Sequence, residues 1–262
     1  DEFLELAYGN TVNDPHNNWS GNSQCGSGYT VVGMGNVDLT GGTNGQMNDV
    51  YAEPGVGLRA WCGNDRCNVN ALCGRVSDAS GNNVLSISAS ANVNGGHGWG
   101  PFSNCDDTKR SLGLSRFDLH ASGTSTSVEI NHITCSVSEN GCKIYGLNSD
   151  TTVSSMCASV PGHFIDVVTG THISNQAHGW TPQSTCPAGY EAVGFAEMDN
   201  YSAAPGQDVN HFQIVLNGGA QAYYHGNSAG GSTQALCAKI MECTGLPAHA
   251  EIVYKNNDGA TS

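Results

Sequence analysis

Positive charge is scarce in this sequence. Its 262 residues include only nine lysines and arginines against 23 aspartates and glutamates, which gives a net charge of −14. Nucleic acids and anionic membranes attract clustered Lys and Arg, so we expect neither as a partner. No apolar run approaches the roughly 18–20 residues of a spanning helix, so we also expect no membrane span.

Apolar residues make up 38% of the chain and aromatic residues 7%, which is little for one deep core, and charged residues are only 12%. Glycine is abundant, at 35 residues, and no stretch keeps a 3.6-residue period long enough for a firm helix; a short turn of helix over 234–241 is the one helical option. Such a composition is typical of short strands joined by tight turns, and it predicts an all-β fold.

Eleven cysteines are present, but no C-x2-C pair and no C-x-x-C-H motif, which argues against zinc ribbons and c-type haem. Many cysteines without metal-binding spacing indicate disulfides and an oxidising compartment. We therefore expect a secreted protein, extracellular or at the cell surface. A chain that begins at Asp1 without methionine fits a mature protein after signal-peptide removal.

A framework of four residue types occurs three times with identical offsets. Each copy has a tryptophan, a cysteine six residues later, and then a glycine eight and an aspartate thirteen residues after that cysteine. The copies are Trp19-Cys25-Gly33-Asp38, Trp99-Cys105-Gly113-Asp118 and Trp180-Cys186-Gly194-Asp199. This period predicts three homologous modules of about 80 residues in a pseudo-threefold, prism-like arrangement. We place them at 1–81, 82–161 and 162–243, with an extra strand and tail at 244–262.

Each module is expected to start with a short apolar strand, which we name its leading strand, at 3–7, 84–88 and 164–168. In the segment after the opening cysteine, Val32 and Met34 have one strand parity and Val37 has the other. The same switch recurs in the other two copies. A change of parity within one strand predicts a bend or bulge.

The cysteines sort by module. Equivalent positions should pair equivalently, so we expect the long bridges Cys25–Cys73, Cys105–Cys157 and Cys186–Cys237. Each closes a loop of about fifty residues, which in the chain-entropy model contributes ~4 kcal/mol. Cys62–Cys67 and Cys135–Cys142 would span hairpin tips, and Cys243 is left unpaired or intermolecular.

Two recurring sets of residues could hold metal. His16, His97 and His178 precede the three tryptophans and could converge on Zn or Cu at a threefold axis, or each could cap a turn or stack on its neighbour. Asp38, Asp118 and Asp199 could each hold calcium, although no D-x-D-x-D-G loop is present. An aspartate that holds a turn through backbone amides is the alternative, and we expect no cofactor other than calcium at such sites.

Trp19, Trp99 and Trp180 could be platforms for sugar rings, or core plugs over the opening disulfides. The segment 226–230 matches the G-x-S-x-G nucleophile elbow, but only His249 follows it, and no α/β core could be completed. We therefore predict a protein that is not an enzyme.

The third copy contains C-P-A-G-Y-E-A-V-G-F at 186–195 and D-V-N-H-F at 208–212. It resembles the repeats of vitelline membrane outer layer protein I, in which a Trp precedes C-P-x-G-Y/F, G-F and a D…N-x-I segment. The C-P-x-G-x3-G phrase is also similar to one in secreted bacterial β modules. The resemblance implies a three-sided β-prism and a non-enzymatic extracellular coat or glycan-binding protein, and it supplies no catalytic residue.

A fourth strand of the leading type, at 250–254, follows the third module. It could close a ring beside the first module, or add head to tail to the next molecule where 3–7 would otherwise lie, with Cys243 locking the joint. The residues of these assembly strands are Phe3, Leu4, Leu6, Ile252, Val253 and Tyr254. The first function predicted is thus a structural subunit of an extracellular filament, coat or matrix; the alternative is a lectin-like glycan-binding protein with three repeated sites.

Overall fold

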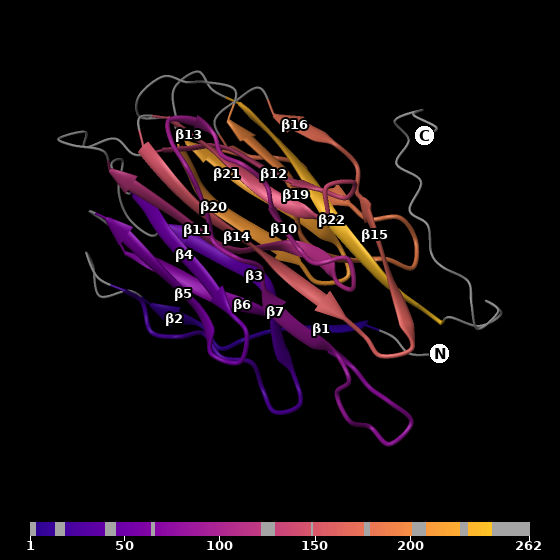
Figure 1. Cartoon of the computed structure of the whole chain (residues 1–262). Coiled ribbons are helices and arrows are strands. Elements are labelled where there is room, and N and C mark those ends of the chain that lie inside the picture. The colour runs from indigo at the N-terminus through magenta and orange to yellow at the C-terminus, as the bar shows by residue number, and fades with distance from the viewer. Residues whose placement is uncertain are drawn as a thin grey trace, which may run out of the picture.

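The computed structural model describes residues 4–13, 19–39, 46–63, 66–121, 129–147, 149–175, 179–200, 208–225 and 230–242 (Figure 1). The described chain is built of strands, and three antiparallel sheets surround one apolar core. No helix in these ranges is long and apolar enough to cross a membrane. The expected all-β fold of disulfide-linked modules is confirmed.

Every module contributes the same three long strands. The closing strand lies between the leading strand and the core strand and is antiparallel to both. In chain order, leading, core and closing strands are β1 (Leu4–Tyr8), β3 (Thr30–Leu39) and β6 (Cys67–Val76); β7 (Ser86–Ala89), β11 (Arg110–Ala121) and β14 (Ser149–Ser159); β15 (His163–Thr169), β19 (Glu191–Asn200) and β22 (Gly231–Glu242). The segment 234–241, where a short helix was an option, lies inside β22.

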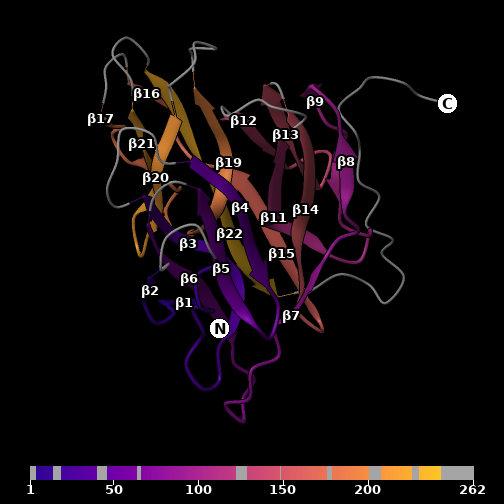
Figure 2. The ribbon, with the colours of Figure 1, turned by 90° about the vertical axis from the view of Figure 1, so that its left-hand side faces the viewer.

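Between its core and closing strands, each module sends out a hairpin. The hairpins are β4 (Gln46–Glu53) with β5 (Gly57–Gly63), β12 (Glu129–Ser136) with β13 (Gly141–Leu147), and β20 (Asp208–Val215) with β21 (Gly219–His225). Each one pairs with the core strand of another module: β4 with β11, β12 with β19, and β20 with β3. Figure 2 shows β4 and β5 beside β11 and β14. The exchange is cyclic, so every sheet combines two modules.

Short strands complete the sheets. Against the closing strands lie β2 (Val12–Asn13), β8 (Val93–Gly95) and β16 (Ile173–Asn175). Against the outer hairpin strands lie β9 (Gly98–Trp99) and β10 (Ser103–Asn104), then β17 (Gly179–Trp180) and β18 (Ser184–Thr185). In the first module, the isolated bridges Trp19↔Trp61 and Ser23↔Leu58 take the place of such short strands against β5. Each framework tryptophan is thereby held against the hairpin of its own module.

The three framework glycines bring the core strands together inside the molecule. A Cβ on Gly194 would lie 2.5 Å from the carbonyl oxygen of Leu112, and one on Gly33 would lie 2.9 Å from that of Val193. Gly113 has φ +120°, and a Cβ there would lie 3.3 Å from the Cα of Gly194. Since only glycine allows backbones so close, the recurring glycine is explained by this central contact.

Side chains fill the rest of the interior. Phe195 and Phe212 from different sheets meet edge to face at 5.5 Å, and Phe117 and Ile133 are fully buried beside them. The cavity that these residues line has a volume of about 10 Å³. That is room for a water molecule at most, so this cavity cannot hold a larger ligand.

Five disulfides join the described cysteines, in the same pairs that the module spacing predicts: Cys25–Cys73, Cys62–Cys67, Cys105–Cys157, Cys135–Cys142 and Cys186–Cys237. The three long bridges have Cα–Cα distances of 5.6, 5.6 and 5.8 Å. Each links the turn before a core strand to the closing strand of the same module. Cys243 lies outside the described residues.

Candidate ligand-binding sites at the module seams

The places where a hairpin pairs with the core strand of another module gather most of the ionisable and aromatic side chains discussed above. We name them the first seam (β4 and β11), the second seam (β12 and β19) and the third seam (β20 and β3). One framework aspartate lies in each: Asp118, Asp199 and Asp38, respectively. Its partner in the register is Asp49, His132 or His211.

In the second seam, His132 lies between an indole and a carboxylate. Its Nδ1 is 3.4 Å from Oδ1 of Asp199, and its ring meets that of Trp99 edge to face at 4.6 Å. Its Nε2 lies 2.9 Å from the hydroxyl of Thr134. Tyr145 meets the same indole at 5.6 Å, so Trp99 is held by two rings of its own hairpin.

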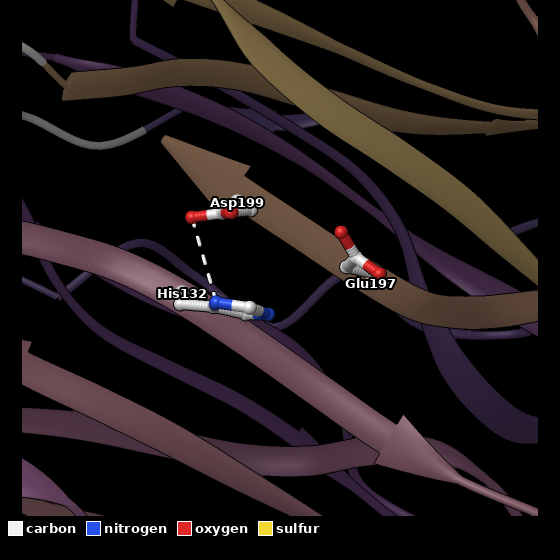
Figure 3. Close-up of side chains that lie close together, drawn as sticks. All are labelled: His132, Glu197 and Asp199. Carbon is white, nitrogen blue, oxygen red and sulfur yellow. Dashed lines mark ion pairs between the residues drawn. The ribbon is translucent and has the colours of Figure 1, made fainter. Parts of the chain in front are cut away.

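Two more polar side chains reach this seam. Glu197 lies two residues before Asp199 on β19, and both carboxylates project on the side of the sheet where His132 lies (Figure 3). One ligand atom from each of these three residues lies within 4.8 Å of those of the other two. Oε1 of Glu197 also lies 3.4 Å from Nε2 of His172 and accepts a hydrogen bond from Ser232 at 2.6 Å.

The third seam repeats this arrangement without the second carboxylate. His211 Nδ1 lies 3.3 Å from Oδ1 of Asp38, and its Nε2 lies 2.6 Å from the side-chain oxygen of Asn36, which has the place of Glu197. The His211 ring meets Trp180 edge to face at 4.4 Å. Tyr223 meets the same indole at 5.7 Å, as Tyr145 meets Trp99.

The first seam has different chemistry. Asp118, which is buried, accepts hydrogen bonds from Tyr51 at 2.9 Å and from Arg116 at 2.6 Å. Asp49 faces it, and one carboxylate oxygen of Asp49 is buried without a hydrogen-bond partner. Burial, with Asp118 close by, raises the pKa of Asp49 to about 8. One proton is therefore held between the two carboxyl groups at neutral pH.

Electrostatics in the histidine seams favour neutral imidazoles. Burial lowers the pKa of His132 and of His211, against the opposing effect of their aspartates. Burial also raises the pKa of Asp199. Since both shifts disfavour the charged form, desolvation outweighs the attraction within the His132–Asp199 pair.

The framework tryptophans differ in exposure. Trp99 is 45% exposed and Trp180 38%, so the expectation of core plugs is wrong for these two. Trp19 is half-buried: it stacks on Tyr51 at 4.8 Å, and the guanidinium of Arg59 lies 4.8 Å over its ring. The indole is thus less exposed in the first seam than in the other two, and in the second seam the Lys143 ammonium lies 4.4 Å over the Trp99 ring.

Other sequence-predicted residues fall elsewhere. Asp38, Asp118 and Asp199 lie within strands and contact side chains of another module, rather than holding turns. His97 is exposed, while His16 and His178 lie outside the described residues, so no three-histidine site is seen in the described part. The extra strand 250–254 and Phe3 also lie outside it, whereas Leu4 and Leu6 form β1 against the closing strand of their own module.

His132, His211, Glu197 and His172 were not singled out from the sequence. A signal was present, because the hairpins share the dipeptides Asn131-His132 and Asn210-His211, with Asn48-Asp49 in the first module. Their distances from the opening cysteines differ, at 27, 25 and 24 residues, so a search for fixed offsets passes over them. No protein-family model and no curated protein matches this chain.

Proposed function

We propose that this protein is a secreted glycan-binding protein without enzymatic activity. The observation that carries the proposal is the pair of exposed indoles at equivalent places, Trp99 and Trp180. Large exposed aromatics are costly to leave in water and are characteristic of recognition surfaces. A sugar ring presents apolar C–H groups that stack on such a face, and hydroxyls that bond nearby polar groups.

The arrangement of neighbours supports this interpretation. In both seams the histidine and the tyrosine contact the indole edge to face, which fixes the orientation of the ring. Asp199 and Asp38 are carboxylate acceptors for sugar hydroxyls beside the imidazoles. Because the indoles are immobilised in the free protein, binding loses little conformational entropy there. Because Trp19 is half-buried under Arg59, we expect two glycan-binding sites rather than three.

The second seam also resembles a hydroxyl–imidazole–carboxylate triad, formed by Thr134, His132 and Asp199. Two features favour the non-enzymatic interpretation. The 3.4 Å between His132 and Asp199 exceeds a hydrogen-bond distance. β12 also pairs with β13 on one side and β19 on the other, so the backbone amides around Thr134 are engaged in sheets rather than directed at an oxyanion.

A glycan array, with intrinsic tryptophan fluorescence for the saccharides it identifies, tests the proposal. Trp99→Ala and Trp180→Ala should each remove one of two sites, and the double variant should remove both. Met241→Ala, which truncates another exposed apolar side chain at 43% exposure, is the matched control and should bind like the parent. Retained binding by a folded double variant, or no retention of the parent by neutral, acidic or amino sugars, contradicts the proposal.

Secretion is proposed because five disulfides of this kind persist in oxidising compartments.

A second candidate function is the structural one, head-to-tail assembly through the extra strand at 250–254. It is favoured by the position of β1 at the end of its sheet, where it pairs with β6 along one edge among the described strands. Since β1 already fills the place beside β6, an incoming strand would add next to β1 rather than replace it.

A further inference from the structure

We propose that the second seam binds one divalent metal ion of the zinc class, with His132, His172, Glu197 and Asp199 as its ligands. Two imidazoles and two carboxylates form a donor set that Zn²⁺ accepts. The proposal does not depend on glycan binding.

The distances fit a tetrahedral ion. Ligand bonds of ~2.1 Å place neighbouring donors of a tetrahedron about 3.4 Å apart. Nδ1 of His132 lies 3.4 Å from Oδ1 of Asp199, and Nε2 of His172 lies 3.4 Å from Oε1 of Glu197. One ligand atom from each of His132, Glu197 and Asp199 lies within 4.8 Å of those of the other two (Figure 3), and His172 contacts the cluster through Glu197.

Partners outside the donor set hold two of the ligands in position. The ring nitrogen of His132 that faces away from Asp199 lies 2.9 Å from the Thr134 hydroxyl. Metal-bound histidines characteristically use their second nitrogen in this way, which fixes the ring orientation. Ser232 bonds Glu197 at 2.6 Å and does the same for the carboxylate.

Among the described residues, the second seam has one carboxylate more than the third and lacks the arginine of the first. The position of Glu197 is occupied by Arg116 in the first seam and by Asn36 in the third. Arg116 pairs with Asp118 at 2.6 Å and supplies a fixed cation there. The second seam instead has two carboxylates, and each raises the Coulomb energy of the other. A divalent cation neutralises both.

Access from solvent is available. The side chain of His172 is 49% exposed, while those of Asp199 and Glu197 are 27% and 26% exposed. The cluster is therefore partly desolvated, which strengthens charge interactions, yet an ion can reach it without opening of the fold. The positive charge of Lys143 lowers the pKa of His132, and its ammonium lies over the Trp99 and Phe102 rings at 4.4 and 4.5 Å.

The test is calorimetric titration of the full chain with Zn²⁺ alone, without saccharide. All proteins should carry Cys243→Ser, so that a free thiol cannot bind the metal. The parent should take up one ion per chain, and Co²⁺ in its place should give the visible absorption of a low-symmetry site. Glu197→Asn, which copies the third seam, should weaken binding at least tenfold, and His132→Ala should do likewise.

Asp38→Asn is the matched control, since it removes the equivalent carboxylate of the third seam, and it should bind zinc as the parent does. Circular dichroism checks that each variant is folded. Absence of a stoichiometric zinc site in the parent would overturn the proposal. So would equal affinity in folded Glu197→Asn and the parent, because the ion would then be held elsewhere on the chain.

Discussion

Replacement of Gly194 by alanine probes the contact at the centre of the molecule. The added Cβ would lie 2.5 Å from the Leu112 carbonyl oxygen and 3.2 Å from the Cα of Gly113. Both neighbours are backbone atoms of another core strand, so no side-chain rotation relieves the overlap. Overpacking of a tight interior costs about 1–3 kcal/mol, and a clash with backbone belongs at the upper end, ~3 kcal/mol.

For a chain of this size, 1 kcal/mol corresponds to roughly 2–4 °C in Tm, so Gly194→Ala should lower the melting temperature by roughly 6–12 °C. Scanning calorimetry measures this directly. Gly26→Ala is the control: its added Cβ has no atom within 4 Å, and its φ is not in the left-handed region. It should leave Tm unchanged or slightly raised. If the two variants melt within about 2 °C of each other, the central contact does not limit the fold as we argue.

Three further outcomes are expected. The pKa of Asp49 is raised to about 8 in the folded protein, from ~4 when unfolded. The contribution of protonated Asp49 to stability is therefore fully present below pH 4 and is lost as the pH rises through 8. Over this range the Tm of the parent should fall relative to that of Asp49→Asn. Parallel plots of Tm against pH for the two proteins would contradict the shared proton. Removal of Cys186 and Cys237 together should lower the free energy of unfolding by ~4 kcal/mol in denaturant titrations, and a loss below 1 kcal/mol would contradict the chain-entropy argument. If the parent assembles in gel filtration through the extra strand, deletion of residues 249–262 should abolish the assembly, and unchanged assembly would disprove that route.

Some of this fold could be predicted from local patterns. The parity switch between Met34 and Val37 predicts a bulge, and the pairing of β3 with β6 shifts register between Met34 and Asn36. Equivalent shifts occur in β11 and β19. Cysteines at equal offsets predicted the long disulfides for a related reason. Each bridge lies within one module, and homologous modules form the same bridge at the same spacing.

The pairing between modules could not be predicted in this way. A hairpin such as β12–β13 has the same alternation whether it folds onto its own core strand or onto another, and only the three-dimensional arrangement selects β19. For this reason, the residues that meet at a seam could not be identified from the sequence. Asp199 recurs at a fixed offset and was found, but His132 comes close to it, and His172 to Glu197, only because distant segments lie side by side in the fold. The exposure of Trp99 likewise depends on the tertiary packing.

Because the hairpins are exchanged in a cycle, the single chain has the arrangement of a trimer whose three modules are joined in one polypeptide. Two of its three seams join modules that follow one another along the chain, while the third, β20 against β3, joins the last module to the first through strand pairing, and no disulfide links these two modules among the described cysteines. A single module produced alone would have a hairpin to donate and an unpaired core strand to accept one. Such a head-to-tail contact closes after three copies, so an isolated module should assemble with C3 symmetry. The single chain fixes that stoichiometry within one molecule and leaves each seam free to differ, which a homotrimer with identical seams could not do.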